Sequence, residues 1–83
     1  MPTREKRLQR ARNNPKNVSF QDLCSILQDH GCEIKSGKGS HHVARLPGTS
    51  KKLTFPKPTR GPMKPVYVEM ALGLIDEILE ALE

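Results

Sequence analysis

The chain has 83 residues but no tryptophan, one tyrosine and two phenylalanines. Proteins that bind single-stranded nucleic acid by stacking successive bases need several aromatic rings, so this composition argues against that class. The two cysteines, Cys24 and Cys32, are too few for a disulfide framework, and neither belongs to a paired zinc motif. No apolar run is long enough to span a membrane, and the charged N-terminus lacks the apolar stretch of a secretory signal. We therefore expect reduced thiols and a cytoplasmic protein.

Acidic residues are missing from the middle of the chain. Residues 35–64 contain eight cations and no acid: Lys35, Lys38, Arg45, Lys51, Lys52, Lys57, Arg60 and Lys64. From Pro65 onward the pattern reverses, with five acids and no cation. A basic segment of this length favours binding to a polyanion, chiefly nucleic acid.

The first sixteen residues are also basic, with six cations and one acid and thus a net charge of +5. Leu8 and Ala11 are three residues apart, which allows a short helix over residues 3–12, and Asn13-Asn14-Pro15 ends it. This stretch has no broad apolar stripe. We therefore expect residues 1–16 to form a solvated basic arm that adds some electrostatic attraction to RNA, and residues 17–83 to form a single domain.

The remaining sequence predicts an α+β fold. Ser19 and Asp22 have the spacing of a capping box for a helix over residues 19–30, and Gly31 suits its end. Short strands follow over residues 32–36, 40–46 and 51–55, joined by glycine-containing turns that favour an antiparallel meander.

A proline-rich segment over residues 56–65 precedes the last predicted helix, because prolines prevent a helix or a central strand. That helix covers residues 66–82 and has one apolar stripe. The stripe consists of Val68, Ala71, Leu72, Ile75, Ile78, Leu79 and Leu82.

Two adjacent histidines stand where the first glycine turn becomes the second strand. Alternate residues of a strand point to opposite faces, so His41 shares a face with Arg45, and His42 shares the other with Ala44. The second face is the more apolar and should face the core. His41 is then the exposed histidine beside cations, suited to proton transfer near neutral pH, unless it only caps the hairpin. If the faces are reversed, His42 takes this place.

The other histidine arrangements indicate no metal site. Adjacent strand residues point apart, so His41 and His42 are not a pair of metal ligands. His30, at a predicted helix end, is expected to interact with the last carbonyls of that helix. We expect no metal and no small-molecule cofactor.

Several of these segments together resemble the HicA family, the toxins of HicA–HicB toxin–antitoxin pairs. They are residues 18–31, the stretch Lys38-Gly39-Ser40-His41-His42-Val43, the Pro47-Gly48 turn, Leu53-Thr54-Phe55-Pro56 and the last helix. The resemblance covers roughly residues 18–80, most of a one-domain chain. The chain departs from the family pattern where Lys57 follows the proline, a place that often holds a histidine.

The resemblance implies a fold like that of double-stranded-RNA-binding domains, in the order α-β-β-β-α, with two helices on one face of a three-stranded antiparallel sheet. It also implies an mRNA interferase, with a HicB-type antitoxin as partner. The family's catalytic histidine, which follows Gly-Ser, falls on His41, with His42 as second choice.

We expect the RNA contacts to come from the turn, the strands and the proline-rich segment. The candidate RNA-binding residues are Lys35, Lys38, Ser40, Arg45, Lys57, Arg60 and Lys64. Cleavage would be metal-independent, because RNA supplies its own nucleophile in the 2′-hydroxyl. The alternative is a non-catalytic double-stranded-RNA-binding module, which would use the same basic surface and need no histidine.

Overall fold

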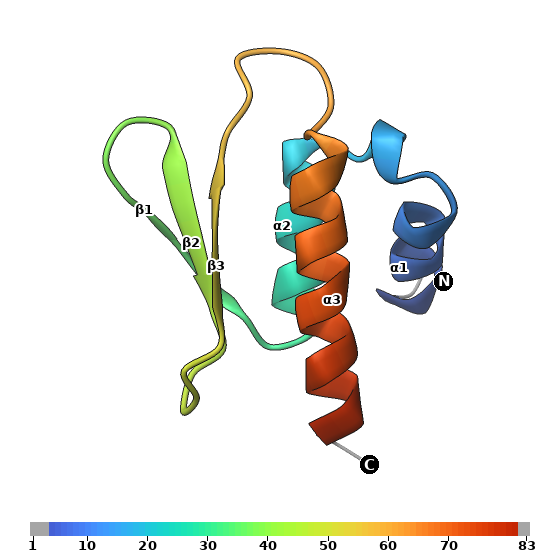
Figure 1. Cartoon of the computed structure of the whole chain (residues 1–83), viewed down its shortest axis with the longest axis vertical. Coiled ribbons are helices and arrows are strands. Elements are labelled where there is room, and N and C mark those ends of the chain that lie inside the picture. The colour runs from blue at the N-terminus through green and yellow to red at the C-terminus, as the bar shows by residue number, and fades with distance from the viewer. Residues whose placement is uncertain (1–3, 82–83) are drawn as a thin grey trace.

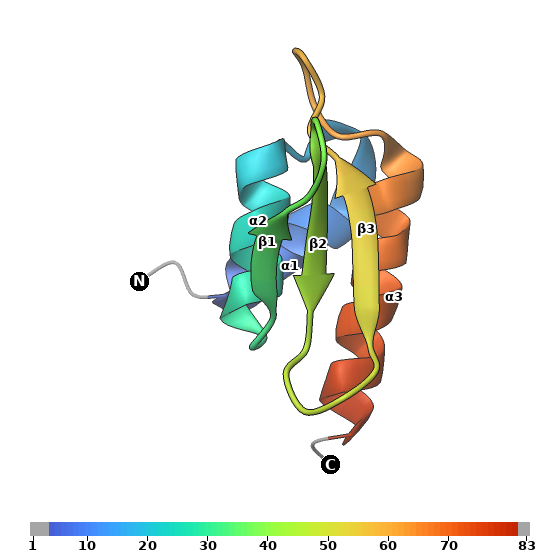
Figure 2. The ribbon, with the colours of Figure 1, turned by 90° about the vertical axis from the view of Figure 1, so that its left-hand side faces the viewer.

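Three layers make up the computed structural model, which describes residues 4–81: a sheet, a pair of helices on it, and a further helix outside them (Figure 1). The elements in chain order are α1 (Arg4–Asn13), the short 3₁₀ helix η1 (Pro15–Asn17), α2 (Phe20–Asp29), β1 (Glu33–Ser36), β2 (His41–Arg45), β3 (Lys52–Pro56) and α3 (Pro65–Ala81). Figure 2 shows α2 and α3 both behind the sheet, and no described element in front of it. The predicted α+β fold, with α-β-β-β-α order and two helices on one face, is confirmed.

The sheet has the order β1-β2-β3 with antiparallel neighbours, which confirms the predicted meander. In register, Ala44 of β2 lies between Ile34 and Leu53. Ala44 is fully buried against the helices, whereas Arg45 beside it is exposed. The predicted assignment of strand faces is therefore correct.

The strand boundaries differ slightly from the predicted ones. β1 begins at Glu33 instead of Cys32, β2 is one residue shorter at each end, and β3 is shifted to Lys52–Pro56. Pro56 pairs with His41 at the end of an outer strand, where the lack of an N–H breaks no hydrogen-bond ladder.

The start of α2 is fixed by the predicted capping box. Ser19 Oγ accepts a hydrogen bond from the Asp22 backbone N–H at 3.0 Å, and the Asp22 carboxylate accepts one from the Ser19 N–H at 3.4 Å. At the other end, Gly31 has φ +94°, a value that a residue with a Cβ adopts only with strain. The box fixes where Phe20, the first residue of α2, leaves the capping turn.

The buried stripe of α3 differs in part from the predicted one. Its buried residues are Val68, Ala71, Leu74, Ile75 and Ile78. Leu74 was not predicted, Leu72 is only partly buried, and Leu79 remains 37% exposed. The sheet and α2 cover a narrower arc of the helix than the apolar sequence pattern suggested. Leu82 lies outside the described residues.

The prediction of a solvated arm is wrong for α1. Leu8 is 8% exposed and Ala11 is 2% exposed, and both belong to the core. The helix lies on the far side of α2 and α3 from the sheet (Figure 1). Ion pairs fasten it, from Arg7 to Asp29 of α2 and from Arg12 to Asp76 of α3.

Within residues 4–81, no helix has the length and apolar character needed to cross a membrane.

Candidate nucleic-acid interface at one end of the sheet

Two basic segments meet at the end of the sheet where β2 begins and β3 ends. One is the turn 37–40 between β1 and β2, and the other is the loop 57–64 between β3 and α3 (Figures 1 and 2). The Lys57 backbone N–H donates to Ser40 O at 2.8 Å, which joins the two segments directly. We call this region the histidine end, and define it as residues 37–42 and 57–64 with the start of α2.

The turn is held by its own backbone. The Gly37 N–H donates to His41 O at 2.7 Å, and the His41 N–H donates to Lys38 O at 3.2 Å. Gly39 has φ +61° in this tight turn, where glycine bears no steric cost. The turn therefore holds Lys38 and Ser40 in a defined arrangement at the start of β2.

The loop 57–64 is anchored at its far end. The Met63 N–H donates to Val18 O at 2.8 Å, and the Met63 side chain is 1% exposed. The cations Arg60 and Lys64 on either side of this anchor are exposed. The loop thus carries its cations across the start of α2.

His42 is the histidine whose ring is fixed on several sides. Its Nδ1 lies 3.0 Å from Ser40 O, and its ring meets that of Phe20 edge to face, with 4.8 Å between centroids and 65° between planes. The Phe55 ring lies 6.3 Å away, at 23° to it. A carbonyl oxygen only accepts, so neutral His42 donates from Nδ1 and keeps the lone pair on Nε2.

His41 is less constrained. It is exposed on the opposite face of β2, and its Nδ1 lies 3.3 Å from Lys38 O. Among the described residues no aromatic ring contacts it. The two adjacent histidines thus have different surroundings, one open and one held between rings.

Lys57 lies beside the same aromatic ring as His42. Its Nζ stands 5.5 Å from the centroid of Phe20, within the range of a cation–π contact. Burial raises the pKa of the Cys24 thiol above its ordinary value, and the charge of Lys57 partly opposes this rise. Cys24 is one turn along α2 from Phe20, so both observations place the ammonium over this face of α2.

His30 takes the predicted structural place. Its Nδ1 lies 2.8 Å from Ile26 O, and its backbone caps the end of α2. This is the opposite end of the helix from Phe20, so His30 is remote from the histidine end.

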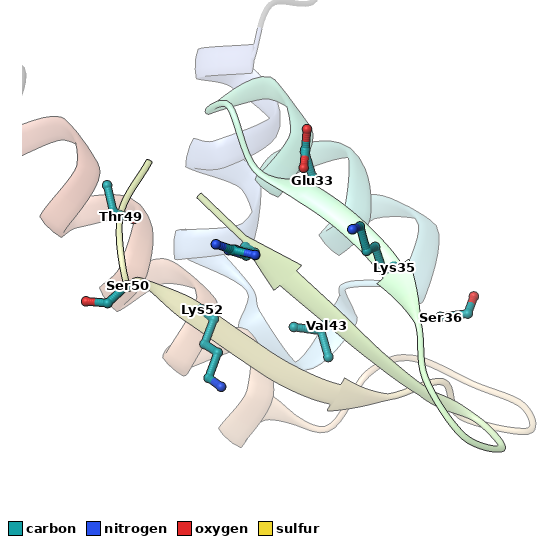
Figure 3. Close-up of a pocket in the computed structure, with 8 residues that line it drawn as sticks. Glu33, Lys35, Ser36, Val43, Thr49, Ser50 and Lys52 are labelled. Carbon is teal, nitrogen blue, oxygen red and sulfur yellow. The ribbon is translucent and has the colours of Figure 1, made fainter. Parts of the chain in front are cut away.

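The other predicted RNA-binding residues, Lys35 and Arg45, lie elsewhere. With Lys52 they surround Val43 in a hollow of about 550 Å³ on the uncovered face of the sheet (Figure 3). Glu33, which lies opposite Arg45 in the strand register, adds one acid to the lining of this hollow. Arg45 is four residues along β2 from His41, a separation of about 13 Å, so it is not part of the histidine end.

The predicted RNA-binding cations form no ion pair with any residue between 4 and 81, unlike Arg7, Arg12 and Lys51. Their charges are available to an external anion. The same range of residues holds no group of three or more His, Cys, Asp or Glu side chains arranged to bind a metal ion.

Phe20 is the feature of this site that the sequence analysis missed. As the first residue of a helix it reads as one apolar position among several. Only the folded chain brings His42 and Lys57 to its ring.

A family model described as "HicA toxin of bacterial toxin-antitoxin" matches residues 20–82, more than half of the chain. The matched region runs from α2 through the three strands and α3, and leaves out α1. Neither the curated proteins nor the solved structures contain a match to the chain.

Proposed function

The chain belongs to the HicA toxin family, the toxins of bacterial toxin–antitoxin systems, and on that premise we propose that it is an mRNA interferase. The observation that carries this proposal is the fixed imidazole of His42 among unpaired cations. RNA cleavage needs a base for the 2′-hydroxyl and positive charge near the phosphate, and the histidine end offers both.

The chemistry follows from the groups present. Nε2 of a neutral histidine takes the proton of the 2′-hydroxyl, and the 2′-oxygen bonds to the neighbouring phosphorus. The bond from phosphorus to the 5′-oxygen breaks, and that oxygen takes a proton from the imidazolium or from water. The products are a 2′,3′-cyclic phosphate and a 5′-hydroxyl, and the step is metal-independent.

His42 is the better candidate for the base, although the sequence alone ranked His41 first. A catalytic group works best when its orientation is fixed before the substrate arrives. The bond to Ser40 O and the contact with Phe20 fix the His42 ring. His41 has one longer bond and an exposed ring. We therefore propose His42 as the general base and keep His41 as the competing choice.

The phosphate contacts come from the same end. Lys57 and His42 both contact the ring of Phe20, so Lys57 is our candidate for stabilising the charge that develops on the phosphate. Lys38, Ser40, Arg60 and Lys64 would hold the flanking backbone. Lys35 and Arg45 would make a separate contact on the open face of the sheet.

Membership in the family also gives the chain a protein partner, because these toxins pair with an antitoxin. We propose that this antitoxin is of the HicB type and covers the histidine end. Charge complementarity would then favour an acidic surface on the antitoxin.

The test is cleavage of a long mRNA by the antitoxin-free protein in the presence of EDTA. We compare the wild type with His41→Ala, His42→Ala and His42→Gln, which keeps a polar side chain of similar length without a basic nitrogen, after checking each fold by circular dichroism. Loss of the base should lower the rate about 10²–10⁴-fold in the His42 variants, with RNA binding retained. The 5′ fragment should end in a cyclic phosphate.

Other outcomes decide against parts of the proposal. Loss in His41→Ala alone returns the role to His41. Full dependence on added metal removes the metal-independent mechanism. If the folded wild type binds double-stranded RNA and cleaves no RNA, the chain is the non-catalytic binding module.

A further inference from the structure

Phe20 contacts both groups that the proposed reaction needs. We propose that it is a positioning residue, which holds the Lys57 ammonium and the His42 imidazole in one fixed arrangement. The effect on cleavage rests on the proposed function, whereas the positioning itself does not.

Phe20 is itself well anchored. It is the first residue of α2, directly after Ser19 in the capping box. Its ring packs against Phe55, with 5.8 Å between centroids and 50° between planes. Phe55 is fully buried, so Phe20 is held by the core on one side and stays partly exposed on the other. A ring supported in this way can orient mobile groups that touch it.

Phe20 and the carbonyl oxygen of Ser40 each contact both His42 and Lys57. Ser40 O accepts a hydrogen bond from the His42 ring at 3.0 Å and from the Lys57 backbone N–H at 2.8 Å. Phe20 contacts the same two residues at their outer ends, the imidazole edge to face and the ammonium at 5.5 Å from its centroid. His42 and Lys57 are therefore each held at two places, by the Ser40 carbonyl and by the Phe20 ring.

This arrangement matters because a free lysine side chain is costly to order. Fixing its rotamers costs conformational entropy, and the face of an aromatic ring restricts them without neutralising the charge. Lys57 remains exposed, so its ammonium is accessible to a phosphate. A cation that is already placed contributes most where charge develops, in the transition state.

The substitution Phe20→Leu tests the proposal, since it keeps an apolar side chain and removes the ring. We expect kcat to fall about tenfold, equivalent to about 1.4 kcal/mol, with KM nearly unchanged because the other cations still bind RNA. Phe20→Tyr should restore kcat. The matched control is Tyr67→Leu, at the other partly buried aromatic residue, which has no ring contact with a histidine or a lysine among the described residues.

A second measurement needs no activity. In nuclear magnetic resonance spectra of the wild type, the ring current of Phe20 should shift the terminal methylene protons of Lys57 upfield, and the Nδ1–H of His42 should be protected from exchange. Both signatures should be lost in Phe20→Leu, return in Phe20→Tyr and persist in Tyr67→Leu.

The outcomes separate the two proposals. If the wild type cleaves no RNA but Phe20→Leu loses both spectral signatures, the positioning role is supported and the ribonuclease proposal is refuted. An active wild type whose signatures are unchanged in Phe20→Leu overturns the positioning role. So does an equal fall of kcat in Phe20→Leu and Phe20→Tyr, because the ring is then not what matters.

Discussion

Leu8→Ala tests whether α1 is part of the folded domain. Leu8 is 8% exposed and packs in the core with Ala11, and the nearby Arg7–Asp29 ion pair reinforces the contact. Removing its branched end leaves a cavity between α1 and the helices beneath it. Such truncations cost about 2–5 kcal/mol in well-packed cores. Because α1 is an outer layer that can relax inward, we expect the lower part of that range, about 2–3 kcal/mol.

That loss is large for a chain of this size. A domain of 83 residues has a free energy of unfolding of about 4–12 kcal/mol. Each kcal/mol corresponds to about 4–8 °C in the melting temperature of a small domain, so the midpoint should fall by about 10–20 °C. The measurement is thermal and urea unfolding followed by far-ultraviolet circular dichroism.

The control is Val66→Ala on α3, where the side chain is 53% exposed and the change should stay below about 0.5 kcal/mol. If Leu8→Ala is as mild as this control, α1 does not pack and the solvated arm expected from the sequence is correct. At low temperature Leu8→Ala should cleave RNA at the wild-type rate, because α1 lies on the far side of the helices from the sheet.

Three further predictions concern charge. The hydrogen bond from Arg12 holds the pKa of Asp76 below its ordinary value of 3.8, so this pair stabilises the fold fully above about pH 5 and ceases to do so as the pH falls through the lowered pKa. Asp76→Asn should cost less than about 1 kcal/mol at pH 7, and urea titration should show this cost shrinking as the pH falls below 3.8. Lys57→Gln removes the charge that partly opposes the rise in the pKa of Cys24, so less thiolate should form at pH 8. Alkylation of that thiol, followed by peptide mass spectrometry, should then be slower than in the wild type. An unchanged rate would contradict the placement of the Lys57 ammonium. Lys57→Gln should lower both RNA affinity and kcat. Arg45 lies about 10 Å from His42 along β2, so Arg45→Gln should lower RNA affinity alone and reduce the salt dependence of RNA binding by about one charge. Equal effects of the two variants on kcat would show that the open face of the sheet takes part in cleavage.

The sequence predicted the sheet and α2 well because local rules determine them. The capping box at Ser19, the glycine in the first turn and the alternation along β2 each act over a few residues. The burial of Ala44 and the exposure of Arg45 followed from alternation alone. The predicted structure was accurate where it depended on residues close together in the sequence.

The burial of α1 could not be predicted in the same way. Leu8 and Ala11 make a weak stripe, and a weak stripe is buried only if a partner surface exists. That surface belongs to α2 and α3. The sequence indicates it only as the margins of the apolar stripes of those two helices. The same dependence on a partner explains Leu79, which the apolar pattern placed in the core and the structure leaves exposed.

The choice between the two histidines depended on a similar long-range effect. Strand alternation assigned His42 to the face toward the helices, and that placement made it the second choice for catalysis. At the end of a sheet, however, the layer of helices also ends, and Phe20 is the first residue of α2. A side chain that faces the helices at this point is oriented by rings and still partly exposed. The inward face of β2 is thus fully buried in its middle, at Ala44, and partly exposed at its end, where we propose that RNA binds.

The distribution of charge supports the same division of the molecule. Residues 1–16 hold the whole net charge of +5, yet Arg7 and Arg12 of that segment form ion pairs with acids of α2 and α3. The cations of the turn 37–40 and the loop 57–64 form no ion pair within residues 4–81, although residues 17–83 have no net charge. Net charge therefore does not locate the proposed interface. The cations of the histidine end do, because no acid within residues 4–81 forms an ion pair with them.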